Sequence, residues 1–89
     1  MQIKKTKLKG LKIVTNKIYK DSRGYFKEDF KKAFFKGSSF IFSCTSKSKK
    51  NVLRGLHMQT KKKQGKFVSV LKGSILDVVV DLRKNSKTF

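Results

Sequence analysis

The chain has 89 residues and a formal net charge of +19, with 24 basic residues against five acidic ones. A chain of this length forms at most one small domain, which buries only about 60% of the surface of the unfolded chain. No apolar core follows the basic N-terminus and no apolar run could cross a bilayer, so we expect neither a signal peptide nor a membrane span. The single cysteine, Cys44, excludes an internal disulfide and favours a reducing, cytoplasmic location.

Lysine supplies nearly all of the positive charge, because only three of the 24 basic residues are arginine. Two interpretations stay open. The chain could be a small basic β-module that binds nucleic acid, with Lys47–Lys50 and Lys61–Lys63 on phosphates and exposed phenylalanines as stacking platforms. Alternatively, lysine fills solvated positions through compositional drift. Phosphate-clamping and base-reading surfaces favour arginine, which weighs against the first interpretation.

The first third of the sequence predicts short strands, a turn and one helix. Residues 11–21 favour a strand or a pair of short strands, and Asp21, Ser22 and Gly24 supply the chemistry of a turn. Phe26, Phe30 and Phe34 then follow helical spacing, and Gly37 is placed to end a short helix over residues 25–37.

The rest of the sequence predicts more strands separated by solvated loops. Residues 40–44 and 52–59 each favour a strand, and residues 66–82 have the pattern of a hairpin that turns at Lys72 and Gly73. A chain of short strands with one short helix indicates a mainly β protein, either a sandwich or a barrel.

The predicted hairpin makes Lys66 a neighbour of two acidic residues. A two-residue turn at Lys72 and Gly73 puts Lys66 opposite Val79, with Asp77 and Asp81 as its diagonal neighbours on the same face. Either this is a surface ion pair, which contributes little, or it is a charged cluster inside a barrel, which signals a site. The hairpin alone favours the surface pair.

The stretch Leu53–Gln59, LRGLHMQ, places the only histidine three residues after one of the three arginines. It is followed by Q-G-K at Gln64–Lys66 and preceded by D-S-R-G-Y-F-K-E at Asp21–Glu28. These motifs, together with residues 67–83 and the ending NSKTF, make the chain resemble the first half of the dTDP-4-dehydrorhamnose 3,5-epimerase family of the cupin superfamily.

The resemblance implies a cupin-type jelly-roll barrel, a dimer at full length, that inverts C3 and C5 of a dTDP-4-keto-6-deoxyhexose on the way to dTDP-rhamnose. It implies that His57 is the catalytic base, that Lys66 stabilises the enolate and contacts substrate, and that Arg54 contacts the substrate. It also implies that Arg23, Phe26 and Glu28 bind the nucleotide end of the substrate.

The chemistry of such a reaction explains these residue types. A neutral imidazole has a pKa suited to removing a proton next to a carbonyl, and the developing enolate needs a fixed donor such as a lysine. The planar fork of arginine suits a diphosphate. Because simple alternation puts Arg54 and His57 on opposite faces of a strand, we expect a bulge or kink at Gly55.

The resemblance also bears on metal binding, which is common among cupins. Gln59 and Lys66 stand at or near positions where metal-binding cupins carry ligands, and a protonated lysine cannot ligate a metal. We therefore expect neither a metal nor another cofactor.

Two departures from the family limit the prediction. Phe42, Ser43 and Cys44 stand where the family has Gln-Asp-Asn, which leaves the identity of the sugar nucleotide open. The family's second half, which supplies a proton-donating Tyr, an Asp that orients the base and a further His, has no counterpart. We expect residues 1–89 to be the N-terminal portion of a single domain, a fragment or truncated reading frame, inactive alone. A related dTDP-sugar epimerase or ketoisomerase of altered specificity is the alternative within the superfamily.

Overall fold

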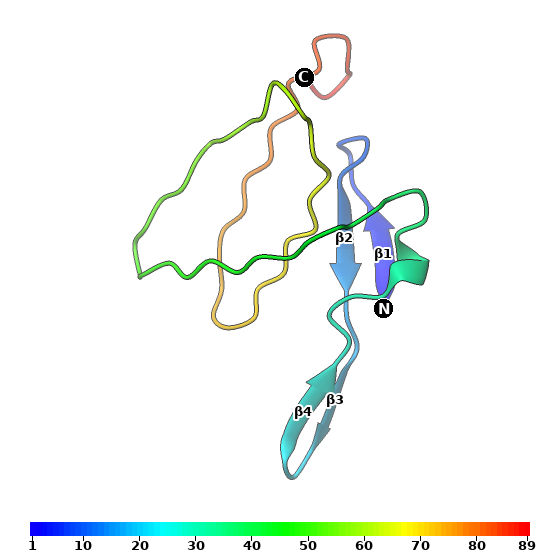
Figure 1. Cartoon of the computed structure of the whole chain (residues 1–89), viewed down its shortest axis with the longest axis vertical. Coiled ribbons are helices and arrows are strands. Elements are labelled where there is room, and N and C mark those ends of the chain that lie inside the picture. The colour runs from blue at the N-terminus through cyan, green and yellow to red at the C-terminus, as the bar shows by residue number, and fades with distance from the viewer.

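The computed structural model describes residues 1–89 and contains four short strands in two separate antiparallel sheets (Figure 1). The elements are β1 (Gln2–Lys5), β2 (Lys12–Thr15), β3 (Ile18–Asp21), β4 (Gly24–Lys27) and the 3-10 turn η1 (Lys32–Phe34). The radius of gyration is 15.5 Å, whereas a compact domain of this length has a value of about 12 Å. The chain is therefore more expanded than a compact domain. The prediction of a mainly β, incomplete fold is confirmed, and the strands do not close into a barrel.

Strand β1 pairs with β2, and Ile3 lies opposite Val14 in the register. The Thr6 side chain organises the connecting loop, because its hydroxyl accepts from the Leu8 amide at 3.2 Å and lies 3.0 Å from the Leu11 carbonyl oxygen. The Thr6 amide also donates to the Leu11 carbonyl at 3.3 Å, which closes the loop. No pattern in the sequence predicted β1, although β2 lies within the predicted strand region.

Strands β3 and β4 form a hairpin, which the sequence did not predict, and its two-residue turn at Ser22 and Arg23 lies where the sequence predicted a turn. Asp21 lies opposite Gly24, and the Arg23 amide donates to Asp21 Oδ1 at 2.8 Å. Gly24 has a φ of +135°, in the region that favours glycine over residues with a Cβ. The turn chemistry therefore comes entirely from residues adjacent in sequence, which is why it could be predicted.

The predicted helix over residues 25–37 is wrong apart from the three residues of η1. Phe26 lies in β4, and η1 begins after Lys31, whose side chain makes no capping hydrogen bond. The first turn has no acidic residue, so neither a cap nor the helix dipole stabilises a longer helix. An isolated helix of about 12 residues has only marginal stability in water. Phe26 therefore pairs with β3 in the hairpin instead of joining a helix.

The strands predicted at residues 40–44, 52–59 and 66–82 are not formed. These segments are extended but have no strand partners, and Figure 1 shows residues 36–89 as wide, open loops. The chain bends at Lys72 and Gly73, as predicted, without the hydrogen-bonded ladder of a hairpin. A strand is stable only when a neighbouring strand satisfies its backbone groups, and here none does.

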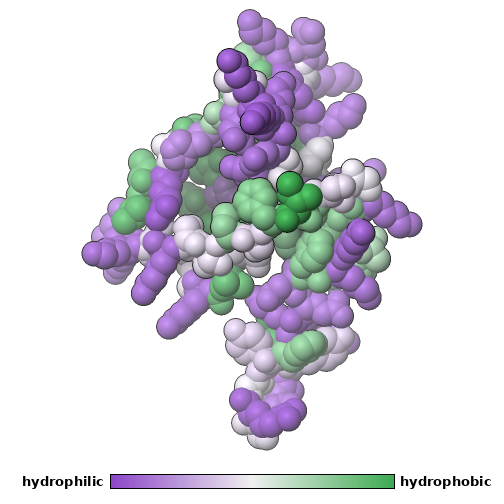
Figure 2. Space-filling view, in the orientation of Figure 1, coloured by the Kyte–Doolittle hydropathy of each residue, from purple (hydrophilic) through white to green (hydrophobic).

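No residue of the chain is buried. The nearest approach to a core is a cluster of Phe30, Phe35, Phe40 and Phe67, whose ring centroids lie 4.8–6.4 Å apart. Large apolar side chains elsewhere face solvent, and Leu53 and Leu76 are each 91% exposed. Figure 2 shows apolar patches among the polar surface of one face. No helix is long and apolar enough to cross a membrane.

The exposed apolar surface predicts self-association of the isolated chain. At about 25 cal/mol per Å², leaving several such side chains in water forfeits several kcal/mol, comparable to the whole stability of about 5–15 kcal/mol of a domain. We expect sedimentation to give a species larger than the 10.3 kDa monomer, with no cooperative unfolding transition in urea.

A pair of variants tests whether apolar contacts cause this association. Ile75, 61% exposed, and the neighbouring Ser74 are both open to solvent. Ile75→Lys should weaken association about tenfold, because burying one isoleucine contributes about 1.5–3 kcal/mol. Ser74→Lys adds the same charge without removing apolar surface and should weaken association less. A monomeric chain that unfolds cooperatively would contradict the prediction.

Candidate functional site

Two of the predicted substrate-binding residues, Arg23 and Phe26, line one small cleft at the tip of the β3–β4 hairpin. The cleft has a volume of about 240 Å³, and Asp21, Gly24 and Tyr25 complete its lining. Phe26 is 66% exposed, and its ring centroid lies 6.4 Å from that of Tyr19 across the hairpin. An aromatic face and a guanidinium are thus presented side by side, an arrangement suited to a ring and an anionic group.

The Asp21 carboxylate holds the Arg23 guanidinium. Arg23 Nη2 lies 2.7 Å from Asp21 Oδ2, and Nε lies 3.4 Å from Oδ1. The side-chain hydrogen bond to Arg23, followed by its backbone amide, holds the pKa of the Asp21 carboxyl below its ordinary value. Because the Arg23 side chain is 88% exposed, water screens this pair and a phosphate could displace the carboxylate.

The third residue expected at the nucleotide end, Glu28, follows β4 and is exposed. It forms no ion pair, whereas its neighbours Lys27 and Asp29 pair at 3.5 Å. Glu28 does not line the cleft that holds Arg23 and Phe26.

Arg54 is oriented by the loop that precedes it. Its Nε donates to Ser48 Oγ at 2.8 Å, and its Nη2 donates to the Lys47 carbonyl at 3.1 Å. Gly55 has a φ of +108°, so the expected kink is present between Arg54 and His57. His57 is exposed and makes no hydrogen bond through its ring.

The predicted association of Lys66 with Asp77 and Asp81 is wrong in this structure. Lys66 is exposed, and the chain's three ion pairs are Arg23–Asp21, Lys27–Asp29 and Arg83–Asp81. Asp81 pairs instead with the arginine two residues further along, because that contact needs no cross-strand partner. The pairing with Lys66 depends on the ladder of the hairpin, which is not formed.

Asp81 is the most completely hydrogen-bonded side chain in the protein, and its importance was missed from the sequence. The carboxylate is 3% exposed and accepts from the Arg83 amide at 3.0 Å and Arg83 Nε at 2.8 Å. It also accepts from Arg83 Nη2 at 3.0 Å and from the Ser86 and Thr88 hydroxyls, both at 2.6 Å. The signal was the Asp-x-Arg spacing, which Asp21 and Arg23 share with Asp81 and Arg83.

The structure does not assemble Arg54, His57 and Lys66 into one site. No hydrogen bond or ion pair joins any two of them, and none lines the cleft at the hairpin tip. No three His, Cys, Asp or Glu side chains lie close enough to hold a metal ion. The expectation that the pocket takes no metal or other cofactor stays a prediction.

Comparison with known proteins decides the family. The family model described as dTDP-4-dehydrorhamnose 3,5-epimerase matches residues 5–89. This chain belongs to the dTDP-4-dehydrorhamnose 3,5-epimerase family. The match includes every motif on which the resemblance was based, from Asp21 to the C-terminal residues, so the family assignment made from those motifs is confirmed.

Curated relatives of the same name support the assignment. The protein from Methanothermobacter thermautotrophicus is 48% identical over 89 residues, covering 96% of this chain and 48% of the relative. The protein from Salmonella typhimurium is 41% identical over 95 residues, covering all of this chain and 52% of the relative. The chain thus spans about half the length of these relatives. No solved structure matches it.

The hydrogen bonds to Asp81 predict a measurable pKa change. Arg83, then Ser86 and Thr88, hold the pKa of the Asp81 carboxyl well below its ordinary value. The ionised Asp81 carboxylate therefore stabilises the structure at pH values above its pKa in the unfolded chain, about 3.9. This stabilisation is lost as the pH falls through the lower pKa that Asp81 has in the structure. Arg83→Ala should raise the Asp81 pKa toward the ordinary value, measured by carboxyl carbon NMR against pH.

Lys84→Ala is the matched control, since it removes a neighbouring positive charge that forms no hydrogen bond or ion pair with Asp81. It should change the Asp81 pKa much less than Arg83→Ala does. Equal shifts in the two variants would show that general charge, and not the hydrogen bonds, controls this carboxyl.

Proposed function

We propose that this chain supplies the proton-abstracting base and part of the substrate-binding surface of a dTDP-4-dehydrorhamnose 3,5-epimerase. The match of the family model over residues 5–89 carries the proposal. The substrate is then a dTDP-4-keto-6-deoxyhexose, and the reaction is inversion at C3 and C5. Residues 1–89 form the first portion of a single barrel domain in this proposal, and the complete protein is a dimer.

The proposed chemistry begins at His57. Its neutral imidazole removes the proton next to the ketone, and Lys66 donates to the enolate oxygen that develops. Both steps are favourable only in a site that excludes water, since a dry site strengthens the interaction of the lysine with the developing charge. His57 and Lys66 must therefore leave the exposed positions that they occupy on unpaired segments.

The nucleotide end of the substrate is proposed to bind at the β3–β4 tip. The exposed Arg23 guanidinium can form a bidentate contact with a phosphate once Asp21 releases it, and the Phe26 ring offers a face on which the thymine can stack. Glu28 and Arg54 complete the proposed substrate contacts. Arg54 is already oriented through Ser48 and Lys47, which lowers the entropic cost of binding.

A cytoplasmic location is part of the proposal. Cys44 is an exposed free thiol, and a free thiol persists in a reducing compartment.

The decisive experiment uses a chimera in which residues 1–89 replace the matching part of the Methanothermobacter relative. The chimera restores the length of that relative, and the 48% identity makes the exchange of segments conservative. Solvent deuterium should enter C3 or C5 of the ketosugar with the chimera, and His57→Asn should lower that exchange at least 100-fold, which is the typical contribution of a general base. Mass spectrometry of the recovered sugar measures the incorporation.

Lys66→Ala in the same chimera separates catalysis from binding. It should lower turnover far more than it lowers affinity for dTDP, because Lys66 acts mainly on charge that exists in the transition state. Lys63→Ala, in the preceding loop, removes the same charge and should change neither. Deuterium exchange that persists in His57→Asn would assign proton removal to another residue.

A further inference from the structure

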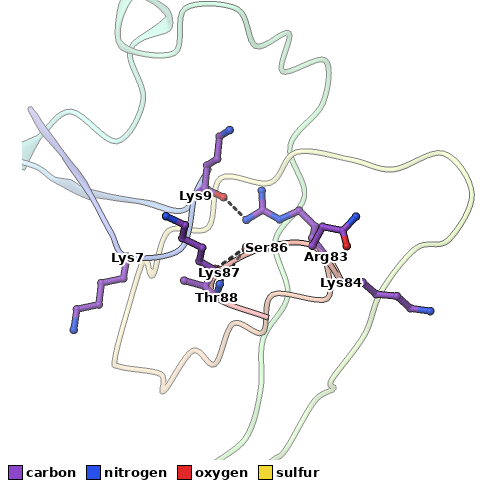
Figure 3. Close-up of a pocket in the computed structure, with 8 residues that line it drawn as sticks. Lys7, Lys9, Arg83, Lys84, Ser86, Lys87 and Thr88 are labelled. Atoms are coloured by element: carbon purple, nitrogen blue, oxygen red, sulfur yellow. Dashed lines mark hydrogen bonds between the residues drawn. The ribbon is translucent and has the colours of Figure 1, made fainter.

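One cleft of the molecule is lined only by polar side chains and lies away from every residue proposed to bind the sugar nucleotide. It has a volume of about 590 Å³ and lies where the β1–β2 loop meets the C-terminal turn (Figure 3). Its lining residues are Lys7, Lys9, Arg83, Lys84, Asn85, Ser86, Lys87 and Thr88.

One hydrogen bond joins the two walls of this cleft. Arg83 Nη2 donates to the Lys9 carbonyl at 2.8 Å, across 74 positions of sequence. Arg83 is itself fixed by Asp81, which also holds the Ser86 and Thr88 hydroxyls at 2.6 Å. Figure 3 shows the bond to Lys9 and, next to it, the C-terminal turn that carries Ser86, Lys87 and Thr88. The cleft is therefore built by specific contacts between the two ends of the chain.

Most of the positive charge of this cleft has no acidic partner. Five of its eight lining residues are cationic, and the lysines among them form none of the chain's three ion pairs. The nearby carboxylate of Asp81 is 3% exposed, and five hydrogen bonds from Arg83, Ser86 and Thr88 saturate it. Four like-charged ammonium groups around one space repel one another, and an anion with several charges relieves that repulsion.

The lining also restricts the kind of anion. None of the eight residues is hydrophobic or aromatic, so the cleft offers no ring on which a nucleobase could stack. Lysine acts as a freely rotating point charge, which suits a chain of phosphates of varied geometry. The Asn85 side chain, which makes no hydrogen bond within the protein, supplies a neutral donor.

We propose that this cleft binds a short oligophosphate and recognises the phosphate chain alone. The proposal is independent of the proposed function, since none of Arg23, Phe26, Glu28, Arg54, His57 and Lys66 lines the cleft. The chain carries a net charge of +19, and the proposal gives four of its lysines, those that line the cleft, a specific role in binding a ligand.

Calorimetric titration of the purified 89-residue chain with inorganic tripolyphosphate tests the proposal. The cleft variant carries Lys7→Gln, Lys9→Gln, Lys84→Gln and Lys87→Gln, which leaves the carbonyl that holds Arg83 in place. It should bind tripolyphosphate at least tenfold more weakly than the original chain. The matched control carries Lys47→Gln, Lys49→Gln, Lys61→Gln and Lys63→Gln, loses the same charge, and should bind within threefold of the original chain.

Three outcomes would overturn the proposal. Equal weakening in the two variants would show that binding depends on net charge and not on the cleft. Absence of tripolyphosphate binding by the original chain would show that the cleft is no oligophosphate site. A single-stranded dT oligonucleotide that binds more tightly than tripolyphosphate, and is weakened equally by the cleft variant, would identify nucleic acid as the ligand. The single substitution Lys84→Glu should also weaken tripolyphosphate binding. It provides an independent check if the cleft variant, with its four substitutions, differs from the original chain in self-association.

Discussion

Hydrogen bonding between neighbouring strands decides which parts of this chain are structured. The chain has 16 backbone–backbone hydrogen bonds, of which eight lie within its regular elements, whereas a folded domain of this length has about 60. Every strand lies between Gln2 and Lys27, where each strand's partner is its neighbour in sequence. The segments that need a partner from elsewhere remain extended, and their apolar side chains remain exposed.

The same constraint divides the candidate site in two. Arg23 and Phe26 lie on a paired hairpin, so their positions relative to each other follow from local geometry. Arg54, His57 and Lys66 lie on segments without strand partners, and nothing holds them together. In the proposed enzyme, pairing of these segments would form the barrel wall and assemble the base with the enolate-stabilising lysine. Folding and catalysis then depend on the same backbone hydrogen bonds.

The features that the sequence predicted are those encoded by neighbouring residues. The turn at Ser22 and Arg23 and the kink at Gly55, seen as its positive φ, each need only a few adjacent positions. The helix predicted over residues 25–37 does not form, because neither a cap nor an acidic first turn stabilises it. The predicted contact of Lys66 with Asp81 is absent because Asp81 pairs with Arg83, two residues away. The segments predicted as strands between residues 40 and 82 have the sequence pattern of strands. They form none, because a pattern does not supply the neighbouring strand that each one requires.

The roles proposed for His57 and Lys66 come from the resemblance to the epimerase family and could not have come from this geometry, where both side chains are exposed. Conversely, the basic cleft at the ends of the chain could not have been predicted from spacing, since Lys7 and Lys87 lie 80 positions apart. The sequence motifs and the contact between the two ends of the chain thus point to two different proposed sites.

Backbone amide hydrogen exchange tests most directly whether strand partners are the missing element. In the 89-residue chain, amides of β1 to β4 should exchange more slowly than those of residues 52–82, which should exchange within about tenfold of an unfolded peptide. In the chimera with the Methanothermobacter relative, residues 52–82 should become protected by at least about 100-fold. Strong protection of residues 52–82 in the 89-residue chain alone, or no gain of protection in the chimera, would contradict the account.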